Sequence, residues 1–196
     1  KTGVDLPNET GALLGNLSKP QQVGYDTAAF GQGIAVTPMQ MIRALGALAN
    51  KGEMVQPHLV SAIRLNSGME RKLDWGQKIR VFSATSTEET VRMMSALNDE
   101  VLFGGKAKIP TMSVAVKTGT SQLTTPTGGY YTDRFFHSFV GFFPAYNPRF
   151  IILLYTNDPK GVQYASETLD VAFLDLVHFL INYYEIPPDR GLQTTP

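Results

Sequence analysis

Two neighbouring apolar segments constrain the fold of this chain more than any other feature. They run from Phe135 to Phe143 and from Arg149 to Asn157, and their short connection contains Pro144 and Pro148. A strand with one solvent-exposed face would alternate apolar and polar residues. The near-continuous hydrophobicity seen here is therefore typical of strands buried on both faces. We therefore expect two adjacent antiparallel strands in a sheet with helices on both sides.

A third strand is expected before this pair, and it ends in polar residues. It runs from Ile109 to Thr120, with an apolar stretch at Val114 to Val116. The residues that follow combine a cation, hydroxyl groups and a glycine: Lys117, Thr118, Gly119, Thr120 and Ser121. An ammonium and two hydroxyl groups at a sheet edge suit a carboxylate, and a glycine lets a ligand approach the backbone.

The tripeptide Lys-Thr-Gly is weak evidence without context. Lys1-Thr2-Gly3 repeats it where no strand precedes, and a turn at a strand end is the alternative reading. The surrounding segments are needed to distinguish a binding strand from a turn.

Along the chain, we expect two helices before these strands and one helix after them. Thr37, Pro38 and Gln40 form a capping-box pattern that begins a helix ending before Gly52. A second helix should start near Thr85 or Ser86 and end at Gly104-Gly105, and a third should run from about Ser166 to Tyr184. The element order predicts an α+β fold with an antiparallel sheet of about three strands.

The remaining segments read as a ribbon and loops. A strand from Val55 to Leu65 and a return strand from Met69 to Leu73 should form an outlying ribbon anchored by Trp75. Residues 1–30 should be loops with at most short helical turns, and residues 122–134 a mobile loop. We expect one domain over residues 1–186 and a disordered tail over residues 187–196.

Composition excludes several classes of function. The chain has 196 residues with 17 basic and 17 acidic side chains, so nothing favours nucleic acid or another polyanion. Cysteine is absent, and His58, His137 and His178 lie too far apart for metal-ligand spacing, so each is expected to be structural. We expect no cofactor, no metal, no membrane span and no signal peptide, and a beginning that suggests a fragment.

An acylated serine would need a lysine three residues later, as in the Ser-x-x-Lys motif that accompanies Lys-Thr-Gly in penicillin-binding proteins and β-lactamases. None of the serines in this chain has one. Phosphate-loop and Gly-x-Ser-x-Gly motifs are also absent. The chain therefore carries a binding strand without a nucleophile.

Five segments follow one another along the chain: Lys1–Pro7; Phe30–Gly33 with Val36–Gln40; Ala49–Gly52 with Pro57–Val60; Val116–Gln122; and His137–Ala145 with Asn147–Arg149. In this order they resemble the C-terminal part of the transpeptidase domain of class B penicillin-binding proteins, of the elongation or division type, over Lys1 to about Tyr184. The resemblance implies a partial β-lactamase/transpeptidase-like fold that lacks its N-terminal strands and nucleophile helix.

The resemblance also implies roles for the polar strand end. Lys117 would bind the carboxylate of a peptidoglycan stem peptide or of a β-lactam, with the Thr118 and Thr120 hydroxyls as hydrogen-bond partners and Gly119 and Ser121 beside them. The Thr120 N–H would be one oxyanion donor, and the nucleophilic serine's own N–H the other. Lys117 and Thr120 are thus the expected catalytic residues.

The family's serine motifs, first strands and membrane anchor lie N-terminal to the segment that resembles Lys1–Pro7. We therefore expect the parent protein to be a serine-type D,D-transpeptidase, membrane-anchored with its catalytic domain on the outer face, alongside cell-wall synthesis partners. The present chain should be soluble and inactive alone, with an exposed sheet edge for another copy or fragment to cover. The alternatives are a D,D-carboxypeptidase, a β-lactam-sensing relative, or a noncatalytic scaffold of the same fold.

Overall fold

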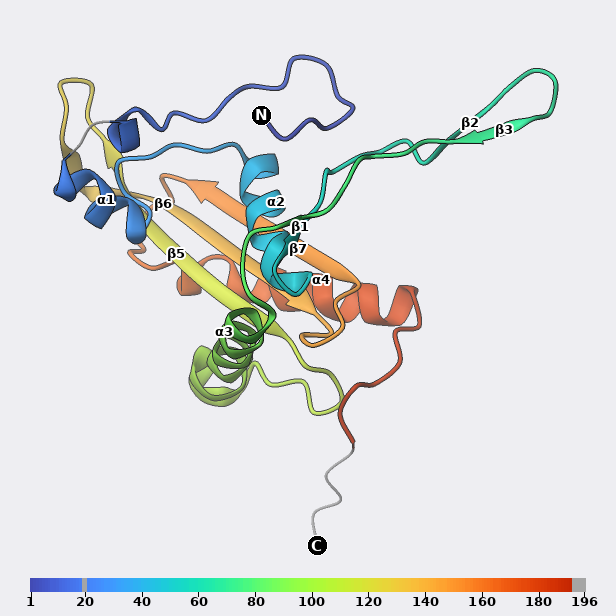
Figure 1. Cartoon of the computed structure of the whole chain (residues 1–196). Coiled ribbons are helices and arrows are strands. Elements are labelled where there is room, and N and C mark those ends of the chain that lie inside the picture. Colours follow the sequence, from blue (N-terminus) through green and yellow to red (C-terminus); the bar gives the residue numbers. More distant parts are fainter. Residues whose placement is uncertain (19–20, 192–196) are drawn as a thin grey trace, which may run out of the picture. The chain divides into compact units, whose positions relative to one another are not determined.

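The structure is a computed structural model, which describes residues 1–18 and 21–191 (Figure 1). Its contacts divide the chain into two compact units, Lys1–Ala84 and Thr85–Pro196. The second unit contains the sheet with the Lys-Thr-Gly strand.

The sheet of the second unit has three antiparallel strands in the order β5-β6-β7. They are β5 (Ala115–Thr124), β6 (Tyr130–Phe143) and β7 (Phe150–Asn157). The expected pair of apolar strands and their third neighbour are therefore confirmed.

The strand ends differ from the expectation. β5 starts at Ala115 rather than Ile109 and continues to Thr124, and β6 starts at Tyr130, so the predicted loop over residues 122–134 is wrong at both ends. Backbone pairing explains the difference, because Gln122 opposite Phe135 and Thr124 opposite Tyr130 extend the ladder without needing apolar side chains.

One face of the sheet packs on α4 (Asp170–Tyr183), which crosses it as the long red helix in Figure 1. Val116, Phe139 and Phe143 share a buried cluster with Phe173 and Val177, and the Phe139 and Phe173 rings lie 4.5 Å apart. The helix begins later than the predicted Ser166, because Ala165–Glu167 form a separate 3-10 turn.

Burial on both faces is confirmed for the end of β6 but not for β7. Val140, Phe142 and Phe143 are buried, whereas the side chains of residues 150–154 are only half-buried. The reason is position, because β7 is an outer strand with β6 as its one neighbour among the described residues.

A helix and an irregular segment lead into β5. The helix α3 (Ala84–Ala96) is followed by a π-helical turn, Leu97–Val101, and then by left-handed backbone at Phe103, Gly104 and Gly105. The predicted stop at Gly104-Gly105 is thus preceded by a change of helix type.

The residues after α4 are anchored as far as Arg190. The Asp189 carboxylate accepts hydrogen bonds from the Ser113 N–H (2.7 Å) and from the Ser113 hydroxyl. Arg190 donates to Asp99 at 2.7 Å and to Ser95 at 3.1 Å. The predicted disordered tail over 187–196 is therefore not met at these two residues, and its last part, residues 192–196, lies outside the described residues.

The first unit consists of short helices and two small ribbons. Its helices are α1 (Gln22–Ala29) and α2 (Pro38–Ala49), and a 3-10 turn, Gly15–Ser18, precedes them. The predicted capping box is present: the Gln40 N–H donates to Thr37 Oγ1 at 3.2 Å, and the Thr37 N–H donates to Gln40 Oε1 at 2.8 Å. The eight-residue α1 exceeds the short turns expected there.

The ribbons are shorter than the apolar pattern predicted. β2 (Ala62–Arg64) pairs with β3 (Glu70–Lys72) in place of the longer strands Val55–Leu65 and Met69–Leu73. A second ribbon, β1 (Glu53–Met54) with β4 (Ile79–Arg80), was not expected.

Trp75 joins the two chain segments at the base of the first ribbon, whereas the predicted anchoring of the ribbon to the body stays a prediction. The Trp75 Nε1 donates to the Val60 carbonyl at 2.7 Å, and its ring stacks on His58 at 5.0 Å.

Gly141 provides a test of the packing between sheet and helix. A Cβ there would lie 2.9 Å from Phe173 Cε2 and 3.0 Å from the Ala115 carbonyl oxygen. We expect Gly141→Ala to lower the free energy of unfolding by about 1–3 kcal/mol, as overpacked core positions do. Denaturant titration measures it. Gly46→Ala is the control, since a Cβ there meets nothing within 4 Å, and a Gly141 variant as stable as wild type would contradict the packing.

Candidate functional site

The Lys117–Ser121 stretch lies in β5, at the edge of the sheet. Among the described residues β5 has a single neighbouring strand, β6, so backbone N–H and C=O groups on its other side are left for a ligand. Figure 1 shows β5 as the yellow strand on the outside of the three.

Side-chain alternation divides the polar residues between the two faces. The register pairs Val116 with Gly141 and Thr118 with Phe139, so Thr118 and Thr120 share the face that packs on α4. Lys117 and Ser121 lie on the opposite face. The structure thus brings all five predicted residues to one edge but separates the ammonium from the two hydroxyl groups.

Lys117 is exposed, and its ammonium donates to the Thr118 carbonyl at 2.6 Å. It makes no ion pair with any residue in the described ranges 1–18 and 21–191. The positive charge is therefore available to an anion that approaches the free edge.

Gly119 has a role that the sequence did not reveal. A Cβ at this position would lie 2.5 Å from the Ser138 Oγ, the side chain of its cross-strand partner. Ser138 Oγ also approaches the Gly119 carbonyl at 3.5 Å. A side chain at position 119 would therefore force the Ser138 hydroxyl into another rotamer.

Thr120 is already engaged on one side. Its Oγ1 accepts a hydrogen bond from the Ala165 N–H at 3.0 Å. A hydroxyl group has one hydrogen, and accepting a bond leaves that hydrogen free to be donated. The Thr120 hydroxyl is therefore set to act as a donor toward a ligand.

The loop that supplies Ala165 rests on His137, which sequence reasoning classed as structural. His137 is fully buried, lies opposite Thr120 in the register, and bonds to Gln163 and Thr168. No motif marks this contact. The one available signal is the antiparallel pairing, which places residue 137 across from residue 120 once the turn between the strands is known.

A charge cluster closes the far end of the sheet. Asp158 Oδ2 accepts from the Arg134 Nη2 at 2.8 Å and from the Lys160 ammonium at 2.6 Å. The Arg134 hydrogen bond, followed by that of Lys160, holds the pKa of Asp158 below its usual value. Asp158 neutralises only one of these two cations. The Lys117 ammonium, in contrast, has no carboxylate partner among the described residues.

The carboxyl of Asp170 is buried in the first turn of α4. The residue is 2% exposed, and neither carboxyl oxygen has a hydrogen-bond partner among the described residues. The helix dipole favours a negative charge there, but the loss of water outweighs it, and burial raises the pKa of Asp170 to about 6.

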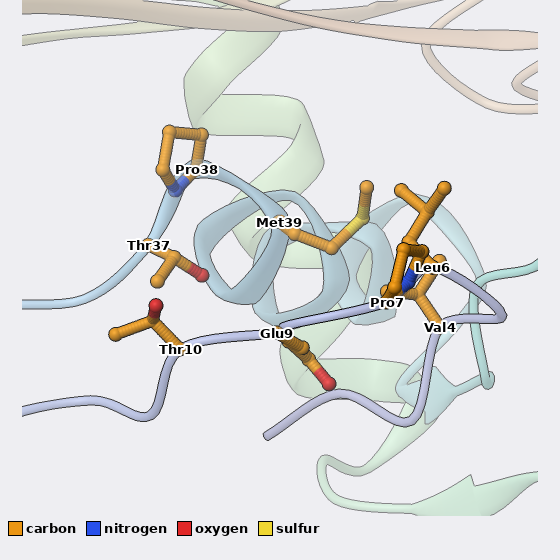
Figure 2. A pocket seen from close by; sticks show the side chains of 8 residues that line it. All are labelled: Val4, Leu6, Pro7, Glu9, Thr10, Thr37, Pro38 and Met39. Atoms are coloured by element: carbon orange, nitrogen blue, oxygen red, sulfur yellow. The ribbon is translucent and has the colours of Figure 1, made fainter.

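A separate pocket in the first unit offers no chemistry. Figure 2 shows it beside the start of α2, between the N-terminal segment and Thr37, Pro38 and Met39. Its lining is mostly apolar, and its carboxylate, Glu9, already accepts from the Thr2 N–H at 2.6 Å and the Gly3 N–H at 3.0 Å. The lining includes no cation, and of its two hydroxyl groups, on Thr10 and Thr37, the second caps α2.

The described part of the chain contains no group of three or more metal-ligating His, Asp or Glu side chains, and none of its helices is long and apolar enough to cross a membrane.

Comparison with known proteins places these features in context. Residues 1–176 match the family described as penicillin binding protein transpeptidase domain. PbpB of Mycobacterium tuberculosis is 30% identical over 202 residues, which cover 97% of this chain and 30% of that protein. A protein of Mesostigma viride named peptidoglycan D,D-transpeptidase FtsI homolog is 29% identical, over 94% of this chain and 33% of its own length.

Solved structures agree. Penicillin binding protein 3 from Mycobacterium tuberculosis in complex with aztreonam superimposes with a TM-score of 0.83 and 26% identity, covering 98% of this chain and 45% of that one. A complex of the same protein with ampicillin gives a TM-score of 0.84. This chain spans about a third of the curated relatives named above.

Asp170 yields a pH-dependent prediction. The folded chain binds this proton more tightly than the unfolded chain does, so the contribution of the Asp170 carboxyl to stability should be most favourable below about pH 4 and should be lost as the pH rises to about 6. We expect Asp170→Asn to raise the free energy of unfolding above pH 6 by up to about 3 kcal/mol, and to leave it unchanged below pH 4. Denaturant titrations at several pH values measure this.

Asp175→Asn, at an exposed position of the same helix, is the matched control. Equal pH dependence in wild type and Asp170→Asn would contradict the buried ionisation.

Proposed function

Because this chain belongs to the penicillin-binding protein transpeptidase family, we propose that it supplies one wall of the active site of a peptidoglycan D,D-transpeptidase. The observation that carries the proposal is the free edge of β5, where Lys117, Gly119 and Thr120 lie on a strand with one neighbour among the described residues. An extended peptide or a β-lactam ring can align with such an edge.

The proposed roles follow from the charge and geometry of β5. The Lys117 ammonium, which forms no ion pair among the described residues, attracts the terminal carboxylate of the stem peptide to the free edge through its charge. The hydroxyl of Thr120, on the opposite face of β5 and already an acceptor, donates its hydrogen to that carboxylate. Thr118 adds a second hydroxyl on the α4 face. Gly119 and Ser121 complete the binding edge.

The chemistry is acyl transfer through a serine ester. The serine oxygen adds to the peptide carbonyl, the negative charge forms on the carbonyl oxygen, and two backbone N–H groups stabilise it. We propose the Thr120 N–H as one of these donors. The terminal amine then leaves with the proton given up by the serine hydroxyl. An acceptor amine from a second stem peptide attacks the ester, and its proton returns to the serine oxygen as the serine is released.

The nucleophilic serine of this reaction is not among the serines of this sequence. None of its serines has a lysine three residues later, and we propose that a polypeptide segment outside this chain provides the nucleophile. The protein that carries this chain is then an enzyme, while the chain by itself is inactive. In that protein we propose a membrane anchor and a catalytic domain on the outer side of the membrane.

Labelling with a fluorescent penicillin tests the missing nucleophile. We expect the protein encoded by the intact gene to form a stable adduct, and the 196-residue chain alone to form none, because no acylable serine is present. Gel fluorescence with mass spectrometry measures both. A stoichiometric adduct on the chain alone would contradict the assignment.

Replacement of Lys117 tests the carboxylate contact. In the intact protein, Lys117→Ala should lower the second-order rate constant of acylation by about 10-fold or more, the size of a lost charge-assisted hydrogen bond. Stopped-flow measurement with a reporter β-lactam gives the rate. Lys108→Ala, at another exposed lysine of the same unit, is the control. Unchanged acylation in Lys117→Ala would overturn the role.

A further inference from the structure

His137 is a buried polar side chain that faces the proposed active-site strand. It lies on β6 directly opposite Thr120 of β5, on the same face of the sheet, and it is fully buried. Burying an imidazole is favourable only if its nitrogens are hydrogen-bonded. Both nitrogens are bonded, and both partners belong to the loop of residues 163–168.

One of the two bonds fixes the position of a hydrogen on the ring. Nε2 lies 2.9 Å from the Gln163 carbonyl oxygen, which can only accept, so Nε2 carries a hydrogen. Nδ1 lies 2.9 Å from the Thr168 hydroxyl. His137 therefore holds the loop at its first and last residues.

The loop is closed between these two anchors. The Glu167 carboxylate accepts from the Gln163 N–H at 3.2 Å and from the Tyr164 N–H at 2.8 Å. The Thr168 hydroxyl also approaches the Ala165 carbonyl at 3.2 Å. These bonds place the Ala165 N–H where it can reach β5.

Ala165 links the 163–168 loop to Thr120 through a hydrogen bond. Its N–H donates to Thr120 Oγ1 at 3.0 Å, and Ala165 itself is buried. The bond fixes one lone pair of the Thr120 hydroxyl and turns the hydroxyl hydrogen away from the loop. Without it the hydroxyl could rotate and present a lone pair to an anion.

We propose that His137 is a positioning residue for Thr120, because it holds the 163–168 loop so that the Ala165 N–H stays on the Thr120 hydroxyl. The hydroxyl is thereby kept as a donor for the carboxylate of the ligand. This inference rests on the proposed function of Thr120 as a substrate-binding residue. His137 touches no reacting atom and acts through the loop alone.

Amide hydrogen exchange in the 196-residue chain tests the link without any activity. His137→Leu keeps an apolar side chain in the buried position and removes both bonds, so exchange at Ala165 should become about 10-fold faster. His137→Gln, which can still donate to the Gln163 carbonyl, should restore part of the protection. His178→Leu, at an exposed histidine of α4, is the matched control and should change nothing at Ala165.

A double-mutant cycle in the intact protein tests the consequence for acylation. His137→Leu and Thr120→Val should each lower the acylation rate constant by about 3- to 10-fold, as expected for one lost hydrogen bond. If His137 acts through the Thr120 hydroxyl, the double variant should be no slower than Thr120→Val. A merely structural role would make the two effects multiply.

Multiplying effects, or unchanged exchange at Ala165 in His137→Leu, would overturn the proposal. Failure of the wild-type protein to be acylated would instead overturn the proposed function, and the exchange experiment would still decide whether His137 holds the loop.

Discussion

The antiparallel pairing of β5 with β6 is the interaction on which the rest of the structure depends. It sets Thr120 opposite His137, Gly119 opposite Ser138 and Val116 opposite Gly141. A slip of one residue would move every side chain to the other face, which would place Lys117 against the buried Phe173 and expose Val116. The same register therefore determines the core and the chemistry of the edge.

The sequence predicted those parts of the fold that depend on side-chain pattern. Burial requires apolar residues, so the β6–β7 pair and the presence of α4 could be predicted. Capping needs particular side chains, so the start of α2 at Thr37 could be predicted as well. The ends of β5 and β6 were not, because backbone pairing at Gln122 and Thr124 is indifferent to side chains. The two-residue strands β1 and β4 leave no pattern for the same reason.

The residues of the candidate site could be predicted from the sequence, but the contacts that hold them in place could not. A cation and hydroxyl groups at a strand end identified Lys117, Thr118 and Thr120, while their division between the two faces came only from the register. His137 and Ala165 act through contacts between residues distant in sequence, and the Ala165 contact uses a backbone N–H that any residue would supply. Such a contact has no signature in a single sequence.

The close approaches at Gly119 and Gly141 differ in how easily the structure can accept a side chain. A side chain added at Gly119 would collide with the Ser138 hydroxyl, and one added at Gly141 would collide with Phe173. A side chain at position 119 can be accepted once the Ser138 hydroxyl turns to another rotamer, because the next atoms lie at 3.9 Å. A side chain at position 141 must displace the ring of a core phenylalanine, so sequence variation along the sheet is cheaper at its edge than at its centre.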